Sequence, residues 1–248
     1  MSAALRFFEA RVAPPMHRLG ELAFVAAVRE ALPWSFCGLA AGFVIFFAIQ
    51  TRSPESHESL ALRLTAALLP AFSLMAVTLA VLLALRLAQR TGSRIAPMLL
   101  ASVGGFALAL PRPFGPDAVQ YLRALGASGI FLALLACGVA GASIAVARRL
   151  RAHFADWVGA ATALAFFALL LLLRISPTAV ILTVMQPMAR LGDSYAALMI
   201  IVLVEALLWT AGVHGPAVLS ALLTPVYLTM QIANTHAFGA HTPLPYIV

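Results

Sequence analysis

Long apolar runs constrain the fold of this chain more than any other feature. Five of them lie at about residues 32–50, 61–85, 96–111, 124–146 and 157–173. A helix needs about 20 apolar residues to cross the hydrocarbon core of a bilayer. Only 10% of the 248 residues are charged and 62% are hydrophobic, whereas soluble domains are about 25% charged. Lipid must therefore cover much of the surface, and the sequence predicts an all-α, polytopic helical membrane protein.

The pattern is less regular in the C-terminal third. Residues 175–194 contain two prolines and are only moderately apolar, so a surface or partly embedded helix is expected there. A sixth apolar run covers residues 195–211, a seventh covers 216–232, and the tail that follows is polar and rich in turn residues. We expect about six to seven membrane helices, with interrupted or re-entrant segments near the C-terminal end.

The arginines predict the orientation of the chain. All sixteen basic residues are arginines, and the net charge is +7. In a soluble protein such a charge would suggest nucleic acid, but here the arginines lie between apolar spans, as the positive-inside rule predicts. Four precede the first span, three follow the second and three follow the fourth, whereas the loops after the first and third spans hold four. The N-terminus is therefore predicted to be cytoplasmic, and no nucleic-acid partner is expected.

Residues 1–31 differ from a signal peptide. They carry four arginines and three glutamates, with apolar residues at roughly helical spacing. The uninterrupted apolar core of a signal peptide is missing, so we expect an amphipathic helix at the membrane surface.

The fourth span is rich in small residues, with Gly129, Gly138 and Gly141 among them. Small residues let helices approach closely in lipid. This face is expected to pack either against a second copy of the chain, in a homodimer, or against other helices of the same chain.

Two polar residues interrupt the sixth apolar run and the stretch after it. Glu205 lies in the middle of the sixth run, where an acid is costly unless it is paired or faces water. It is either a functional group or a protonated acid that bonds a neighbouring helix. His214 and Gly215 lie in GVHG, which is either unwound backbone that lines a cavity or a helix end at the interface.

The C-terminal tail contains Gln231, Asn234 and Tyr246, which have both hydrogen-bond donors and acceptors and suit sugar hydroxyls. The alternative is an ordinary polar loop. His236 and His241 are five residues apart with no third ligand nearby, so no metal site is expected. The motifs of phosphate loops, hydrolase elbows and zinc proteases are also missing, so neither a catalytic residue nor a cofactor is predicted.

Both ends of the chain resemble one known family. The stretch FFEARVAPPMHRLGELAFVAAVREALPWSFCGLAAGFVIFF is similar to the opening of the IIC components of the bacterial sugar phosphotransferase system, of the lactose/cellobiose/diacetylchitobiose type. QPMARLGDS, LLWTAGVHGPAVLSALLTPVYLTMQIANTHAF and PLPYIV resemble later parts of the same family, where GVHG corresponds to Gly-Ile-His-Gly. Members of the family continue past the equivalent of PLPYIV, with a Glu-Pro motif that this chain lacks. At the position of Tyr246, members of the family often have a histidine.

The resemblance implies a division of the chain into three parts. Residues 1–31 would be the amphipathic segment, 32–174 a five-span bundle that makes the dimer contact, and 175–248 the start of the sugar-binding part. It also implies a bacterial inner membrane location and a phosphorylated IIB protein as partner. His214, Gly215 and Asn234 match the family turn and the polar stretch after it.

Three hypotheses follow from the sequence. The first is a IIC-type permease module, at most the membrane component of a sugar phosphotransferase, that binds and translocates a β-linked disaccharide-like sugar. The second is a IIC-derived membrane sensor or anchor fused to a signalling domain such as a cyclic-dinucleotide phosphodiesterase. The third is a structural remnant that only dimerises.

Overall fold

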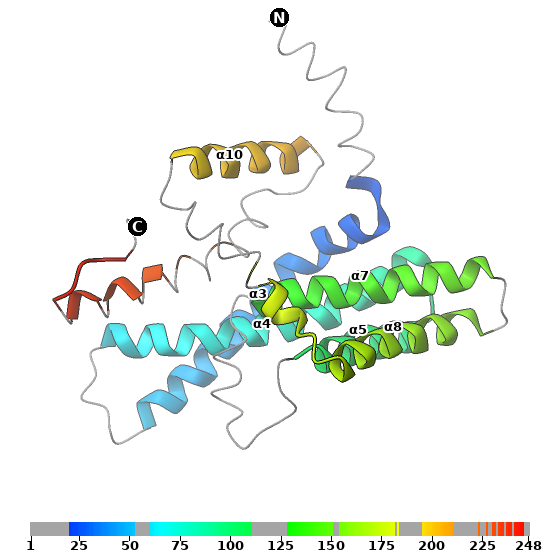
Figure 1. The fold of residues 1–248 in the computed structure, drawn as a ribbon, viewed down its shortest axis with the longest axis horizontal. Helices are drawn as coiled ribbons and strands as arrows, with labels where there is room; N and C mark the ends of the chain where they lie inside the picture. The colour runs from blue at the N-terminus through cyan, green and yellow to red at the C-terminus, as the bar shows by residue number, and fades with distance from the viewer. Residues whose placement is uncertain are drawn as a thin grey trace, which may run out of the picture.

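A computed structural model describes residues 20–52, 60–110, 128–150, 154–181 and 195–210, together with scattered helical positions between 183 and 239 and residues 241–245. Six helices of ten residues or more occupy the continuous ranges (Figure 1), and no strand occurs in the described residues. They are α3 (Ala23–Arg52), α4 (Leu60–Thr91), α5 (Ile95–Leu108), α7 (Ser128–Arg149), α8 (Ala155–Leu172) and α10 (Tyr195–Thr210).

Four of these helices are long and apolar enough to cross a membrane. They are α3, the part of α4 from Ala66, the part of α7 from Gly129, and α8. The 14 residues of α5 extend only about 21 Å at the rise of an α-helix, which is less than the ~30 Å of the hydrocarbon core. α10 is also short, with 16 residues. The predicted interrupted segment around residues 211–222 lies outside the described residues.

α3 begins earlier than the predicted first span. It runs without a break across the predicted boundary between residues 31 and 32, with Pro33 inside it. Proline removes one backbone hydrogen bond, but packing against neighbouring helices makes it tolerable in membrane helices. Leu32 and Ser35 are buried beside it, and the Ser35 hydroxyl donates to the Leu32 carbonyl at 2.6 Å. Tertiary packing therefore allows the helix to continue through Pro33.

α4 is the central helix of the bundle, and it packs against α3, α5 and α7. Its fully buried side chains include Met75, Leu79 and Leu83. α3 lies close to it because glycine removes the side chain at the crossing: a Cβ on Gly42 would lie 3.0 Å from the Cα of Ala71. The core of the bundle forms where α3, α4, α5, α7 and α8 meet (Figure 1).

The small residues of α7 pack within the chain. A Cβ on Gly141 would lie 2.7 Å from Cδ2 of Leu87 in α4, and one on Gly138 would lie 3.6 Å from Phe24 in α3. Cys137, directly before Gly138, is buried, and its thiol donates to the Ala80 carbonyl at 3.4 Å. At least part of this face therefore packs inside one chain, and the homodimer stays a prediction.

Candidate functional site

Three of the six predicted binding residues lie in described parts of the chain: Glu205, Gln231 and Asn234. The other three, His214, Gly215 and Tyr246, lie outside the described residues.

Glu205 lies on α10 and is half-buried. Its neighbours Leu203 and Val204 are exposed apolar side chains, so the acid lies on a helix that is otherwise apolar. α10 stands apart from the five-helix bundle in Figure 1. In the part of the chain that the structure describes, no hydrogen bond or ion pair joins Glu205 to Gln231 or Asn234.

Gln231 and Asn234 lie on a helical stretch, where a polar tail with turns was expected. The Thr235 hydroxyl donates to the Gln231 carbonyl at 2.8 Å, four residues back, as in a regular helix. Asn234 is half-buried, whereas Gln231 is exposed. Residues three apart are neighbours on a helix surface, so both amides can contact a ligand on one side of it.

This helical stretch ends at His241, which has a φ of 54°. The Thr242 N–H donates to the Ala237 carbonyl at 2.9 Å and the His241 N–H to the Phe238 carbonyl at 3.1 Å, the hydrogen bonds of a Schellman helix ending. The turn-rich part of the tail therefore begins only here. The expectation of a turn-rich tail directly after the seventh run is wrong for residues 233–235 and 237–239, which are helical; alanine at 233 and 237 is a good helix former.

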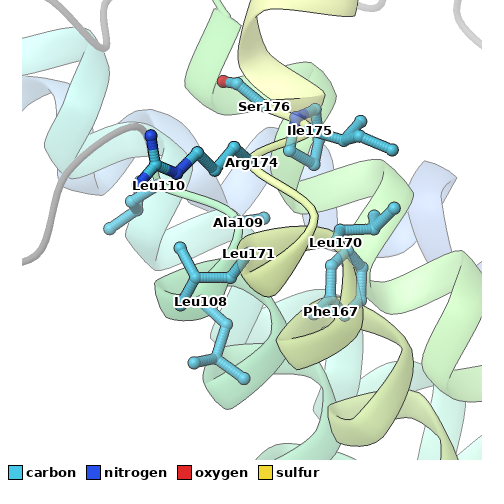
Figure 2. Close-up of a pocket in the computed structure, with 10 residues that line it drawn as sticks. Leu108, Ala109, Leu110, Phe167, Leu170, Leu171, Arg174, Ile175 and Ser176 are labelled. Carbon is cyan, nitrogen blue, oxygen red and sulfur yellow. The ribbon is translucent and has the colours of Figure 1, made fainter.

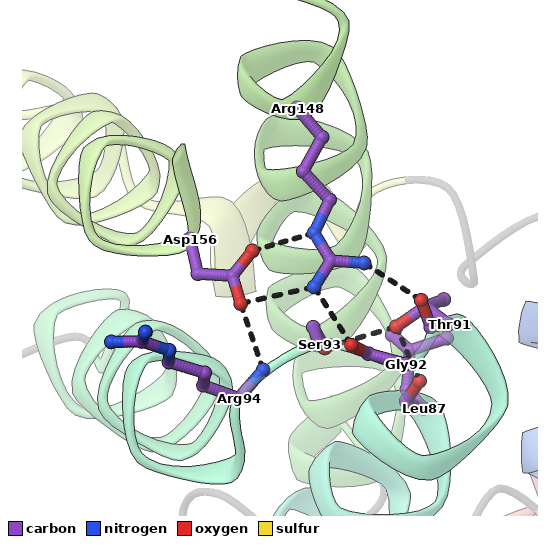
Figure 3. A network of polar contacts seen from close by, with 7 residues as sticks. All are labelled: Leu87, Thr91, Gly92, Ser93, Arg94, Arg148 and Asp156. Carbon is purple, nitrogen blue, oxygen red and sulfur yellow. Dashed lines mark hydrogen bonds and ion pairs between the residues drawn. The ribbon is translucent and has the colours of Figure 1, made fainter. Parts of the chain in front are cut away.

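The most highly connected polar group in the described residues was missed by the sequence analysis. Arg148, near the end of α7, donates from Nε to Oδ1 of Asp156 at 2.6 Å and from Nη2 to Oδ2 at 3.0 Å. It also donates to the carbonyl oxygens of Thr91 at 2.7 Å and Gly92 at 2.9 Å. The backbone N–H of Arg94 donates to Oδ2 of Asp156 at 2.8 Å. Figure 3 shows these bonds, which we call the Arg148 network.

The Arg148 network satisfies helix ends that have no partners within their own helices. The last carbonyls and first N–H groups of a helix lack intrahelical partners, and the network supplies them at the end of α4 and the start of α5. Arg148 lies in the last turn of α7 and Asp156 in the first turn of α8, where their charges also suit the helix dipoles. The Arg148–Asp156 ion pair and its backbone hydrogen bonds therefore connect the ends of α4 and α7 to the starts of α5 and α8.

A second ion pair lies at the same end of the bundle. Arg90 of α4 binds Glu30 of α3, and Arg29 and Arg86 are close enough to act on Glu30 as well. The start of α3, the end of α4 and the ends joined by the Arg148 network therefore share one end of the molecule, and most of the described arginines gather there. The sequence indicated this end of the molecule only through the number of arginines in each loop, and it did not indicate the ion pairs.

The opposite end of the bundle contains a small cavity, which we call the Arg174 pocket (Figure 2). It has a volume of about 200 Å³ and lies between the ends of α5 and α8. Its apolar lining comes mainly from Leu108, Phe167, Leu170 and Leu171, and Arg174 and Ser176 are polar groups at the pocket. Ligand pockets commonly measure about 300–1,000 Å³ and place several polar groups around the ligand, so this cavity is too small and too apolar for a disaccharide.

Comparisons with known proteins point to one group of membrane proteins. The cellobiose-specific EIIC component of a phosphotransferase system from Geobacillus stearothermophilus is 23% identical, over 100% of this chain and 64% of the relative. The lichenan permease IIC component of Bacillus subtilis strain 168 is 26% identical, over 71% of this chain and 46% of the relative. No protein-family model matches the chain.

The fold has a solved counterpart. The crystal structure of ChbC, the IIC component of the N,N′-diacetylchitobiose-specific phosphotransferase system, matches with a TM-score of 0.65 and 21% identity, and the match covers 97% of this chain and 65% of ChbC. The predicted all-α, multi-pass membrane fold is thereby confirmed. This chain spans about half to two thirds of the length of these relatives. The resemblance expected from both ends of the sequence is confirmed as well: the chain is related, in sequence and in fold, to the IIC components of phosphotransferase systems.

Proposed function

We propose that this chain is a membrane-embedded, IIC-type sugar-permease module that binds a β-linked disaccharide-like sugar and takes part in its translocation. The observation that carries the proposal is the relationship to a cellobiose-specific EIIC component along the whole chain. A lichenan permease IIC component and the N,N′-diacetylchitobiose transporter support the same substrate class, because all three names refer to β-linked sugars.

The binding residues in this proposal are His214, Gly215, Asn234, Gln231 and Tyr246, together with Glu205. Histidine, amides and phenol both donate and accept hydrogen bonds, which suits a ligand covered with hydroxyl groups. Gly215 would let the backbone approach the sugar closely. The helical geometry at Gln231 and Asn234 supports the proposal, because it presents two amides three residues apart.

The proposed setting and partners follow the same relationship. The module would lie in a bacterial inner membrane with its N-terminus in the cytoplasm, as a homodimer, and would work with a phosphorylated IIB protein. Phosphoryl transfer would then be the chemistry of that partner, so this chain would need neither a cofactor nor a metal ion.

Ligand-dependent thermal stabilisation of the purified chain tests the binding proposal. A ligand that binds only the folded state at about 100 times its Kd stabilises by about 2.7 kcal/mol, which corresponds to several degrees in Tm for a chain of this size. We expect cellobiose or N,N′-diacetylchitobiose to raise the Tm, and maltose, the α-linked isomer of cellobiose, to leave it unchanged. If neither β-linked sugar raises the Tm, the proposal that this chain binds such a sugar is wrong.

Two substitutions test the site residues separately from the function. His214→Phe and Asn234→Leu are expected to remove the sugar-dependent rise in Tm, because a site built to bond a hydroxyl loses affinity when its partner group is gone. Thr235→Val is the matched control, since the Thr235 hydroxyl bonds to its own helix and its loss is expected to leave sugar binding unchanged. A full sugar response in both site variants would mean that sugar binds elsewhere on the chain.

A further inference from the structure

The turn after α8 has an unusual residue at its centre. Arg174 has a φ of 56°, in the left-handed region where glycine is the usual residue and other side chains cost free energy. The Ile175 N–H donates to the Leu170 carbonyl at 2.9 Å and the Arg174 N–H to the Leu171 carbonyl at 3.1 Å. These bonds form a Schellman helix ending, and its left-handed position is the one that glycine most often occupies.

The helix dipole does not account for an arginine at this position. A cation anywhere in the last turn of α8 would complement the dipole with ordinary right-handed backbone geometry. The left-handed turn instead carries the Arg174 side chain across to the end of α5, where Figure 2 shows it near Leu110 at the Arg174 pocket. Among the described residues no acidic side chain pairs with Arg174, so its charge is available at the pocket.

The rest of the pocket requires an apolar ligand. Leu108, Phe167, Leu170 and Leu171 line the cavity, and the residues beside it on the surface, Leu172, Leu173 and Ile175, are exposed at 80%, 59% and 46%. In a helix that spans a membrane, such side chains face lipid. The pocket is thus at the end of a spanning helix, where lipid headgroups meet acyl chains.

A second polar group can act together with the arginine. The Ser176 oxygen accepts the Ala179 N–H at 3.3 Å, and this leaves the hydroxyl hydrogen to donate. An anionic oxygen near the turn could therefore bond both the guanidinium and the Ser176 hydroxyl.

We propose that the Arg174 pocket binds an anionic phospholipid, with the lipid phosphate on Arg174 and Ser176 and part of one acyl chain in the apolar cavity. A phospholipid combines the two chemistries that the pocket offers and is present at this depth. A free phosphate ion would leave the apolar cavity empty. This inference is independent of the sugar site, because the pocket lies in the bundle and shares no residue with that site.

The test uses the full chain, purified in a neutral detergent, with phosphatidylglycerol or phosphatidylcholine added. Native mass spectrometry would measure the affinity of the tightest-bound lipid, and thermal unfolding would measure the rise in Tm. We expect phosphatidylglycerol to bind more tightly than phosphatidylcholine. Arg174→Gln is expected to weaken phosphatidylglycerol binding about tenfold, as the loss of charge-assisted hydrogen bonds implies, and Arg174→Lys is expected to keep most of the preference.

The Arg174→Gly variant distinguishes between two roles of Arg174, lipid binding and stabilisation of the turn. Glycine relieves the left-handed backbone, so the lipid-free protein is expected to gain in Tm while the response to phosphatidylglycerol is lost. An arginine that merely stabilised the turn would show the opposite, a lower Tm without lipid. Arg149→Gln, an exposed arginine at the other end of the bundle, is the charge-matched control and is expected to keep the preference for phosphatidylglycerol.

Three results would overturn the proposal. One is an unchanged preference for phosphatidylglycerol in Arg174→Gln. Another is equal stabilisation by inorganic phosphate and by phosphatidylglycerol, which would identify a site for free anions. The third is full phosphatidylglycerol binding in Leu108→Phe, a substitution that fills the cavity and is expected to weaken binding if an acyl chain enters it.

Discussion

Arg148 shows how one charged side chain is held at the end of a helical bundle. Its guanidinium contacts two carboxylate oxygens and two backbone carbonyls, so nearly all of its donors are used. Asp156 is 92% shielded from solvent, with an exposure of 8%, and in turn it accepts the Arg94 N–H. A buried carboxylate such as that of Asp156 is tolerated when it is paired and hydrogen-bonded.

Breaking this pair is expected to destabilise the bundle. Asp156→Asn leaves Arg148 without its charge partner, and we expect a loss of about 1–3 kcal/mol in the free energy of unfolding, less than for a fully buried pair because Arg148 is partly exposed. Thermal or denaturant unfolding in detergent would measure it. Glu30→Gln is the control: its pair with Arg90 is more exposed, and such pairs contribute about 0–1 kcal/mol. Equal losses in the two variants would contradict a special role for the Arg148 network.

The sequence predicted Arg148 as a cytoplasmic-side arginine but not what it binds. Asp156 is eight residues further along the chain, beyond the reach of one helical turn, and the carbonyls of Thr91 and Gly92 are more than fifty residues away. Such a contact exists only after four helix ends have met. The same limit applies to the candidate sugar site, where residue chemistry suggested Glu205 and Asn234 as binding groups but could not indicate whether they meet.

The apolar runs predicted the positions of the helices better than single residues predicted where each helix begins. The runs expected at 96–111, 157–173 and 195–211 correspond to α5, α8 and α10 within a few residues, because a continuous apolar run bounded by polar or turn residues favours a single helix. Local signals were less reliable. The first apolar run was expected to begin at about residue 32, but α3 begins at Ala23 and continues through Pro33, since packing on α4 outweighs one lost hydrogen bond.

Among the described spanning helices, we expect a homodimer contact on exposed apolar faces. α3 and α8 are the least buried of the four spanning helices. Trp34 and Val44 on α3 are exposed at 62% and 65%, and Phe166 and Leu169 on α8 are also exposed. A second copy of the chain is therefore expected to contact one of these two faces.

Disulfide crosslinking in native membranes tests the dimer helix by helix. Cys37 is an exposed thiol on α3, and Phe166→Cys in a Cys37→Ser background places one on α8. We expect a covalent dimer from one of the two after mild oxidation. The Cys37→Ser protein retains only the buried Cys137 and is expected to stay monomeric. Monomer alone from both faces, and from positions one turn away on each helix, would remove the dimer proposal.

Considered as a whole, the molecule has two chemically different ends. One carries the Arg148 network, the Arg90–Glu30 pair and the neighbouring arginines. The other carries the Arg174 pocket, between the ends of α5 and α8. The sequence placed arginines before the first span and after the second and fourth spans. The described arginines of these three segments lie at one end of the bundle, which supports the expectation that they lie on the same side of the membrane.

The orientation of the two ends is the last prediction. Arginines resist transfer across the membrane and are retained on the cytoplasmic side, so the end with the Arg148 network and the N-terminus are expected to be cytoplasmic. In a cysteine-free background, Cys37→Ser with Cys137→Ser, a membrane-impermeant maleimide added to intact cells should label Ser56→Cys, which follows the first span. It should leave Ser2→Cys and Leu150→Cys unlabelled until the membrane is opened. Leu150 is the critical position, because it is 75% exposed directly after α7 and so reports on the network end itself. Labelling of Leu150→Cys from outside intact cells would mean that the bundle is inserted the other way round, whatever the N-terminus does.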